Sequence, residues 1–233
     1  MKWSQLFTSS VGKKLTMSLT GLFLIAFLVV HVGINACIWA NDNGEMFNRA
    51  AHFMGTTVVV RIMEVGLFLF LILHIVQGYL LEVKNLSRRG QGYAMSPGNK
   101  TSKWYSRTMG LLGTLLALFL IMHINHFWIG SRFGGMWSVQ AIAEVDYDGK
   151  PYHNQFAQMV DVFKDPFIVI LYVLGCISLA YHLIHGFQSA FRTLGVYNNR
   201  YLVMLRSLGI GFSLIVCLAF AMMPVSMYLG WVR

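Results

Sequence analysis

The chain has 233 residues, of which 56% are hydrophobic and 12% are charged, and its formal net charge is +9 at pH 7. Soluble domains carry about 25% charged residues, so this composition argues against a water-soluble domain and favours an integral membrane protein. The three cysteines, Cys37, Cys176 and Cys217, are isolated from one another, which argues against a disulfide framework and against a zinc site.

Apolar runs long enough to cross a membrane recur five times along the chain. A span needs about 20 residues, because the hydrocarbon core is about 30 Å thick. We therefore expect an all-α integral membrane protein with one transmembrane domain over residues 1–233, in which the first four helices form a bundle. The five expected helices cover residues 14–38, 57–82, 108–130, 166–191 and 202–228.

The basic residues are distributed unevenly between the two sides of these helices. The N-terminal side carries twelve of the 18 lysines and arginines and one acidic residue, Glu82, whereas the other side carries six basic and eight acidic residues. By the positive-inside rule, we expect the N-terminus in the cytoplasm and the C-terminus outside. The positive net charge is thus a topology signal and does not indicate nucleic-acid binding.

The segments between the spans are polar or interfacial. The stretch 40–56 contains NRAAHFM, which is typical of a short helix in the membrane interface, and the basic loop 83–107 is either a docking surface or a solvated positive loop. The outer loop 131–165 is the longest and most polar. It ends in Asp165-Pro166, where an aspartate cap and a first-turn proline predict the start of the fourth span.

One histidine lies inside each of the first four spans: His31, His74, His123 and His182. Ionisable residues inside a membrane are costly and mark candidate functional sites. At about 1.5 Å per residue, His31 and His123 lie about 10–12 Å from the outer ends of their helices. On the same arithmetic, His74 and His182 lie about 12–14 Å from the inner ends. The depths therefore predict an outer and an inner histidine pair, each joining alternate helices.

Two imidazoles at each of two levels are typical of bis-histidine haem used for electron transfer, because no axial position stays open. The chain lacks C-x-x-C-H, which excludes the usual covalent haem attachment. Zinc is disfavoured, since no carboxylate or cysteine lies near these histidines at ligand spacing. A proton relay in a haem-free transporter is the stronger rival, although a relay does not require histidines matched in depth.

Glycines recur at matching positions in the same four spans. Gly21 and Gly113 each precede the histidine of their own span by ten residues, and Gly78 and Gly186 each follow it by four. Ten helical residues rise about 15 Å, so we expect Gly21 and Gly113 near the depth of the inner histidines. These glycines either leave room for a porphyrin edge or allow ordinary close helix packing.

Further ionisable residues lie close to these histidines. His126 and His185 each follow the histidine of their span by three residues, which predicts a shared helix face. His126 is an interfacial residue, a haem-propionate contact or a hydrogen-bond donor to a quinone. Glu64 lies near the outer level with Arg61 one turn beyond it. Glu64 is either a proton acceptor for a quinone or one partner of an ion pair with Arg61.

Several stretches of the chain carry a resemblance to one protein family. They are TGLFLIAFLVVHVGIN, FNRAAHFM, RIMEVGLFLFLILHIVQGYL, GTLLALFLIMHINHFW and LGCISLAYHLIHGFQSAFRTLG. The chain resembles the dihaem cytochrome b membrane anchor of succinate:quinone oxidoreductases (succinate dehydrogenase or fumarate reductase) of the single-subunit, five-helix type. The likeness covers most of the chain and is weakest in the loop 131–165 and in the last span.

The resemblance implies two haem b groups. The outer histidine pair would ligate the distal haem and the inner pair the proximal haem, in agreement with the pairing by depth. His126 and His185 do not fall on ligand positions of the family. Ser18, Arg107 and Arg192, at the inner helix ends, are candidates for propionate contacts of the proximal haem.

The resemblance also implies partners and a location. A flavoprotein subunit and an iron–sulfur subunit would dock on the cytoplasmic face of the bacterial inner membrane. This chain would be a subunit of that enzyme that does not itself bind succinate, and it would pass electrons from the iron–sulfur subunit to a quinone, typically menaquinone. The alternative with the same haems is the cytochrome b anchor of a hydrogenase or formate dehydrogenase.

Overall fold

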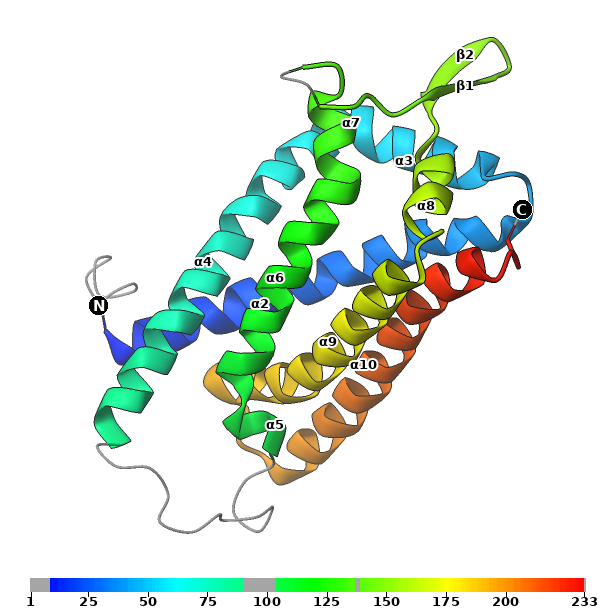
Figure 1. The fold of residues 1–233 in the computed structure, drawn as a ribbon. Helices are drawn as coiled ribbons and strands as arrows, with labels where there is room; N and C mark the ends of the chain where they lie inside the picture. Colours follow the sequence, from blue (N-terminus) through cyan, green and yellow to red (C-terminus); the bar gives the residue numbers. More distant parts are fainter. Residues whose placement is uncertain (1–8, 90–103, 137–138, 233) are drawn as a thin grey trace. The chain divides into compact units, whose positions relative to one another are not determined.

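The computed structural model describes residues 9–89, 104–136 and 139–232. Within these ranges five helices are long and apolar enough to cross a membrane, so the chain is an all-α integral membrane protein, as the sequence predicts (Figure 1). They are α2 (Ser10–Ala36) with its extension η1 (Cys37–Ala40), α4 (Val58–Arg89), α6 (Met109–His123) with its extensions η2 (Ile124–Ile129) and α7 (Gly130–Phe133), α9 (Pro166–Thr193) and α10 (Asn199–Tyr228).

The observed helix ends agree with the expected ones to within four residues, except at the C-terminal end of α4. This helix continues from the expected end at residue 82 to Arg89. The extension, EVKNLSRR, contains good helix formers, and a helix that leaves the hydrocarbon needs no further apolar residues. At the start of α9, the Phe167 N–H donates to Asp165 Oδ1 at 2.8 Å, which confirms the predicted cap.

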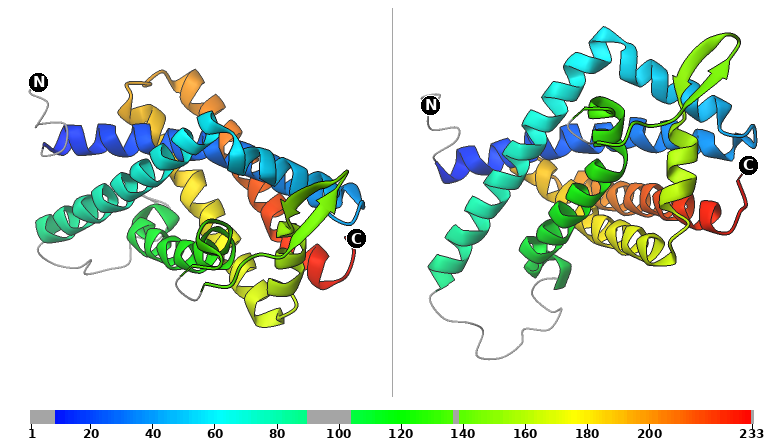
Figure 2. Two further views of the ribbon diagram at one scale, coloured as in Figure 1. Left: turned by 90° about the horizontal axis from the view of Figure 1, so that it is seen from above. Right: turned by 45° about the horizontal axis from the view of Figure 1, so that its top comes forward.

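Shorter elements join the long helices. The helix expected within 40–56 is present as α3 (Glu45–Thr56), and α5 (Trp104–Arg107) precedes α6. The segment between α7 and α9 contains β1 (Glu144–Tyr147), β2 (Lys150–His153) and α8 (Gln155–Val162). The two strands form an antiparallel hairpin that we did not expect, and it lies beside α3 (Figure 2). The middle of the basic loop 83–107, residues 90–103, lies outside the described residues.

Asp148 and Gly149 form the turn of the hairpin, with φ angles of 56° and 74°. Two consecutive positive φ angles characterise a type I′ turn, for which Asp-Gly is a preferred pair. Arg49 on α3 donates hydrogen bonds to the carboxylates of Asp148 and Glu45. The bond to Asp148 first, and then the bond to Glu45, raise the pKa of the Arg49 guanidinium. The hairpin is therefore tied to α3 by charge as well as by packing.

Asn48 connects α3 to the hairpin and to α8, and its side chain is fully buried. Its Nδ2 donates to Tyr147 Oη at 3.0 Å and to Asn154 Oδ1 at 3.2 Å. Its Oδ1 accepts from the Phe156 N–H at 2.9 Å. Because a buried amide must satisfy both ends, this arrangement fixes one relative position of the three elements.

The chain forms two compact units, and each contains a segment of all five long helices. The first, here called the His74 unit, comprises residues 1–27, 66–116 and 178–215. The second, here called the His31 unit, comprises residues 28–65, 117–177 and 216–233. The boundary between the two units crosses the long helices. Each predicted histidine pair lies within one unit.

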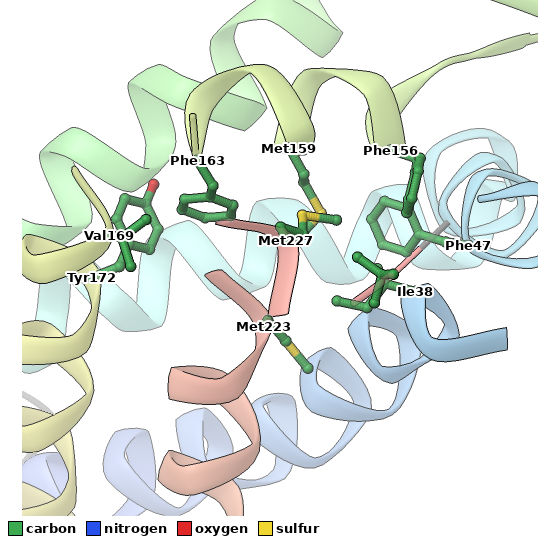
Figure 3. Packing of buried hydrophobic residues seen from close by; sticks show 10 residues of the cluster. Ile38, Phe47, Phe156, Met159, Phe163, Val169, Tyr172, Met223 and Met227 are labelled. Atoms are coloured by element: carbon green, nitrogen blue, oxygen red, sulfur yellow. The ribbon is translucent and has the colours of Figure 1, made fainter. Parts of the chain in front are cut away.

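The His31 unit has a hydrophobic core beneath α8, where side chains of η1, α3, α8, α9 and α10 pack together (Figure 3). The buried members are Ile38, Phe47, Phe156, Met159, Phe163, Val169, Tyr172, Met223, Met227 and Val232. Burying a large apolar side chain stabilises a fold by about 1.5–3 kcal/mol. This core therefore holds the ends of α9 and α10 against the segment that precedes α9.

Candidate functional site

His31 on α2 and His123 on α6 lie together in the His31 unit. Their ring centroids are 5.8 Å apart and their ring planes are nearly perpendicular, at 89°. The pair therefore brings together two helices that are not consecutive among the long helices, as the predicted depths require.

His74 on α4 and His182 on α9 form the equivalent pair in the His74 unit. Their ring centroids are 6.2 Å apart, with an interplanar angle of 63°. The structure thus brings together both histidine pairs that the sequence predicts. The role of these residues as haem ligands stays a prediction.

The spacing of both pairs suits a metal ion held between two imidazoles. Metal–imidazole bonds are about 2 Å long, so two rings that share one ion place their centroids about 6 Å apart. In the described ranges, no group of three or more histidine, cysteine or acidic side chains could hold a metal ion, whereas zinc uses three or four protein ligands. Paired imidazoles instead suit an iron whose other positions are filled by a macrocycle.

One histidine of each pair has a polar side chain at its Nδ1 atom. His74 Nδ1 lies 3.2 Å from Thr20 Oγ1, and His31 Nδ1 lies 3.4 Å from Asn35 Nδ2. A metal-binding imidazole usually makes a hydrogen bond through the nitrogen that does not bind the metal. Thr20 and Asn35 stand at such positions, and the sequence analysis missed both.

The other histidine of each pair has an unsatisfied nitrogen. His123 Nδ1 and His182 Nδ1 are buried and have no hydrogen-bond partner among the described residues. An unsatisfied buried polar atom costs about 1–3 kcal/mol. Such atoms are expected where a ligand, an ion or a water molecule completes a site. The ring spacing of 5.8 and 6.2 Å is the observation by which the residues present fit a bound haem.

Two glycines lie against the rings of the His74–His182 pair. A Cβ atom at Gly21 would be 3.2 Å from His74 Cε1, and one at Gly113 would be 3.9 Å from His182 Cε1. Gly21 and Gly113 therefore lie beside the inner histidines, as the sequence predicts. Gly78 instead approaches Met17, and nothing described lies within 4 Å of a Cβ at Gly186.

Aromatic rings surround the His31–His123 pair. Phe119 stacks on His123 with centroids 5.7 Å apart and an interplanar angle of 20°. Phe127 and Tyr172 lie 5.4 Å and 6.0 Å from the same ring. Phe220 lies 5.5 Å from His31. These side chains keep water away from the pair. Any charge there therefore interacts more strongly with neighbouring charged and polar groups.

Glu64 is the centre of a charged cluster in the His31 unit, and 17% of its side chain is exposed. It accepts hydrogen bonds from Arg61 at 3.0 Å, from Nε and Nη2 of Arg132 at 3.1 Å each, and from Trp128 Nε1. Arg132 also donates to the Gly55 carbonyl at 3.4 Å. The predicted Glu64–Arg61 ion pair is present, and Arg132 is a stronger partner that the sequence analysis did not identify.

His126 lies in η2, which is a π-helix that follows His123 directly. Its Nδ1 is 3.0 Å from Tyr172 Oη, and the two rings stack at an angle of 9°. Gln158 donates to the His126 carbonyl at 3.2 Å. A π-turn is wider than an α-turn and is often found at functional sites. His126 and His123 both lie beside Phe127 and beside Tyr172 on α9, as the predicted shared face requires.

The candidates for propionate contacts all belong to the His74 unit. Ser18 is buried in α2, and its hydroxyl donates to the Lys14 carbonyl at 3.0 Å. Arg107 ends α5, and Arg192 lies in the last turn of α9. All three thus belong to the same unit as the His74–His182 pair, and their contact with a propionate stays a prediction.

The fold and the histidine pairs define a class: an all-α integral membrane protein with two bis-imidazole centres suited to haem. The chain is 27% identical over 177 residues to the succinate dehydrogenase cytochrome b558 subunit of Bacillus subtilis (strain 168), which is 76% of this chain and 73% of that protein. The chain is similar to this cytochrome b subunit, which confirms the family resemblance seen in the sequence. No protein-family model and no solved structure matches the chain.

Proposed function

We propose that this chain is the membrane anchor and two-haem electron-transfer subunit of a succinate dehydrogenase or fumarate reductase. It passes electrons between an iron–sulfur subunit and menaquinone in a bacterial cytoplasmic membrane. The observation that carries the proposal is the pairing of the four span histidines, with ring spacings of 5.8 and 6.2 Å. The name of the Bacillus relative supports a succinate dehydrogenase over a hydrogenase or formate dehydrogenase.

The histidine pairs hold the haem by coordination alone, because the chain has no C-x-x-C-H motif. Haem, when bound, supplies reversible one-electron chemistry. The two imidazoles of a pair would both ligate the iron, which would leave no position for oxygen. Around the His31–His123 pair, Phe119 and Phe127 exclude water. In the His74 unit, Arg107 and Arg192 would supply donors for the propionates, and Ser18 would do so only on releasing its bond to the Lys14 carbonyl.

The quinone site belongs to the His31 unit, with Glu64, Arg61 and His126 as its candidates. Arg61 and Arg132 form ion pairs with the Glu64 carboxylate. This carboxylate is the proton acceptor that quinol oxidation needs. His126 is hydrogen-bonded to Tyr172 beside the haem ligand His123. Glu64 and His126 are thus the two side chains of this unit proposed to exchange protons with the quinone, since the groups around Glu64 are hydrogen-bond donors only.

The flavoprotein and iron–sulfur subunits dock on the cytoplasmic face. That face carries twelve of the 18 basic residues, including those of the loop 83–107. Succinate chemistry takes place in the flavoprotein subunit, so this chain is the quinone-reactive part of the enzyme and has no succinate site.

The test is the haem content of the full chain purified with its partner subunits. We expect two haem b per chain in a pyridine-haemochrome titration, and both should be reduced on adding succinate. A colourless preparation would exclude the proposal and favour the haem-free transporter. A nickel or molybdenum subunit that co-purifies with a haem-bearing chain would favour the hydrogenase or formate dehydrogenase anchor.

His185 offers a matched control for the ligand assignment. It lies three residues after His182 on α9, in the same unit, and its ring belongs to neither pair. We expect His182→Ala to lose one haem and His185→Ala to retain both. The reverse result would assign the ligand to His185.

A further inference from the structure

Helix α2 presents two neighbouring residues to one edge of the His74 ring. Thr20 Oγ1 lies 3.2 Å from His74 Nδ1, and the missing side chain of Gly21 leaves space at Cε1. Thr20 itself is buried, with 5% of its surface exposed. Water is therefore a weak competitor for the contact between its hydroxyl and the imidazole.

The hydroxyl of Thr20 has one proton, and it donates this proton in a hydrogen bond to a backbone carbonyl. Oγ1 lies 2.8 Å from the Thr16 carbonyl and 3.3 Å from the Met17 carbonyl, which is the back-bonding usual for threonine in a helix. These carbonyls can only accept. The Thr20 oxygen therefore has only lone pairs to offer His74, and it accepts a hydrogen bond from the Nδ1–H, beside the backbone hydrogen bond that the ring makes to Met17.

A proton on Nδ1 fixes the tautomer of the ring. In a neutral imidazole one nitrogen carries the proton and the other has the free lone pair. With Nδ1 protonated, the lone pair is on Nε2, the nitrogen that remains for a metal. The acceptor at Nδ1 also makes the ring a more basic ligand.

We propose that Thr20 is a positioning residue that holds His74 as the Nδ1–H tautomer and thereby directs Nε2 to a haem iron between His74 and His182. The inference rests on the proposed function and adds a residue that acts on the haem through its ligand. A more basic imidazole stabilises ferric over ferrous iron. Thr20 thus lowers the reduction potential of this haem relative to a site without the acceptor.

The test compares the wild-type complex with Thr20→Val, which keeps the shape and removes the hydroxyl, and Thr20→Ser, which keeps the hydroxyl. Thr114→Val is the matched control, because Thr114 Oγ1 bonds the Gly110 carbonyl and Tyr79 Oη in the same unit. The measurements are haem content, potentiometric titration of both haems, and electron paramagnetic resonance of the ferric haems.

In Thr20→Val we expect the ratio of reduced to oxidised haem at the His74–His182 pair to rise by up to about tenfold at a fixed potential, the full effect of one hydrogen bond, which is about 59 mV for one electron. The resonance of that haem should shift too. In Thr20→Val, the other haem should keep its wild-type potential and resonance. In Thr20→Ser and Thr114→Val, both haems should keep them.

A Thr20→Val complex with two haems at wild-type potentials overturns the inference and leaves the proposed function intact. If Thr20→Val loses the haem, Thr20→Ser decides: recovery supports the role of the hydroxyl, and continued loss assigns Thr20 to packing. A wild-type complex without haem overturns the proposed function and the inference together.

Discussion

The two histidine pairs have similar ring spacings in different surroundings. At the His74–His182 pair, α2 supplies a threonine hydroxyl and a glycine to one ring. At the His31–His123 pair, stacked aromatic rings surround the imidazoles, and the group near His31 Nδ1 is the Asn35 amide nitrogen, at 3.4 Å. The positions of the helices therefore determine which histidines pair, whereas the neighbouring side chains determine the surroundings of each pair separately.

The strongest test of this separation removes one ligand at a time. We expect His74→Ala to lose the haem of its own pair and to keep the haem of the other, and His31→Ala to do the reverse. Each variant should contain one haem per chain in a pyridine-haemochrome titration. In the His74→Ala complex, electrons should no longer leave the iron–sulfur subunit, so succinate should fail to reduce the remaining haem.

Loss of both haems in either variant would break the comparison, because it would show that the two units fold around their haems together. Retention of both haems in either variant would contradict the ligand pairing itself.

The next largest effect concerns the charged cluster of the His31 unit. Glu64→Gln leaves Arg61 and Arg132 without a carboxylate. Because hydrogen bonds to charged groups contribute about 1.5–3 kcal/mol, we expect a loss of about 2–3 kcal/mol in unfolding free energy. Haem spectra should remain unchanged. Quinone turnover should fall by at least about tenfold, since a positioned proton acceptor contributes more than that.

Asp161→Asn is the control for Glu64→Gln. Asp161 pairs with Lys164 at 2.9 Å in the same unit, but both side chains are about 70% exposed. Exposed pairs contribute about 0.2–1 kcal/mol, so stability and turnover should stay near wild type. Normal turnover in Glu64→Gln together with a loss of stability would make Glu64 a structural residue.

The parts of the molecule that the sequence predicts depend on hydrophobic length and on position along a helix. The spans and the meeting of the histidine rings follow from residue counts, and the Asp165 cap follows from the residue types Asp165-Pro166. Because these helices are apolar on every side, their sequence does not show which face turns inward. For that reason the neighbours of the histidines, such as Thr20 and Phe119, could not be predicted.

Two other features were missed for different reasons. The Asp148-Gly149 turn is a hairpin signal that was present in the sequence and was not used. At the π-turn of η2, His126 contacts Tyr172 and Gln158, which are more than thirty residues away along the chain. A local sequence pattern does not reveal contacts between residues so far apart along the chain.

Gly175 tests the aromatic surroundings of the His31–His123 pair. A Cβ there would lie 2.5 Å from Phe119 Cδ2 and 2.9 Å from its Cγ, so the whole ring that stacks on His123 must move. Overpacking costs about 1–3 kcal/mol. We expect Gly175→Ala to lower stability and to shift the resonance of this haem alone. Gly33→Ala, in the same unit with nothing described within 4 Å, is the control.

The smallest expected effect is at Gly21, where the comparison is sharpest. In a helix, alanine is more favourable than glycine by about 1 kcal/mol, so Gly21→Ala and Gly113→Ala should gain similarly from propensity. Only Gly21→Ala places its methyl group too close to a ring, at 3.2 Å from His74 Cε1 against 3.9 Å at His182. The His74 ring should therefore move by a few tenths of an ångström, which shifts the resonance of that haem without releasing it, while Gly113→Ala keeps the wild-type spectrum. Identical spectra in the two variants would mean that α2 does not hold the ring, and Thr20 would then lose its place in the site.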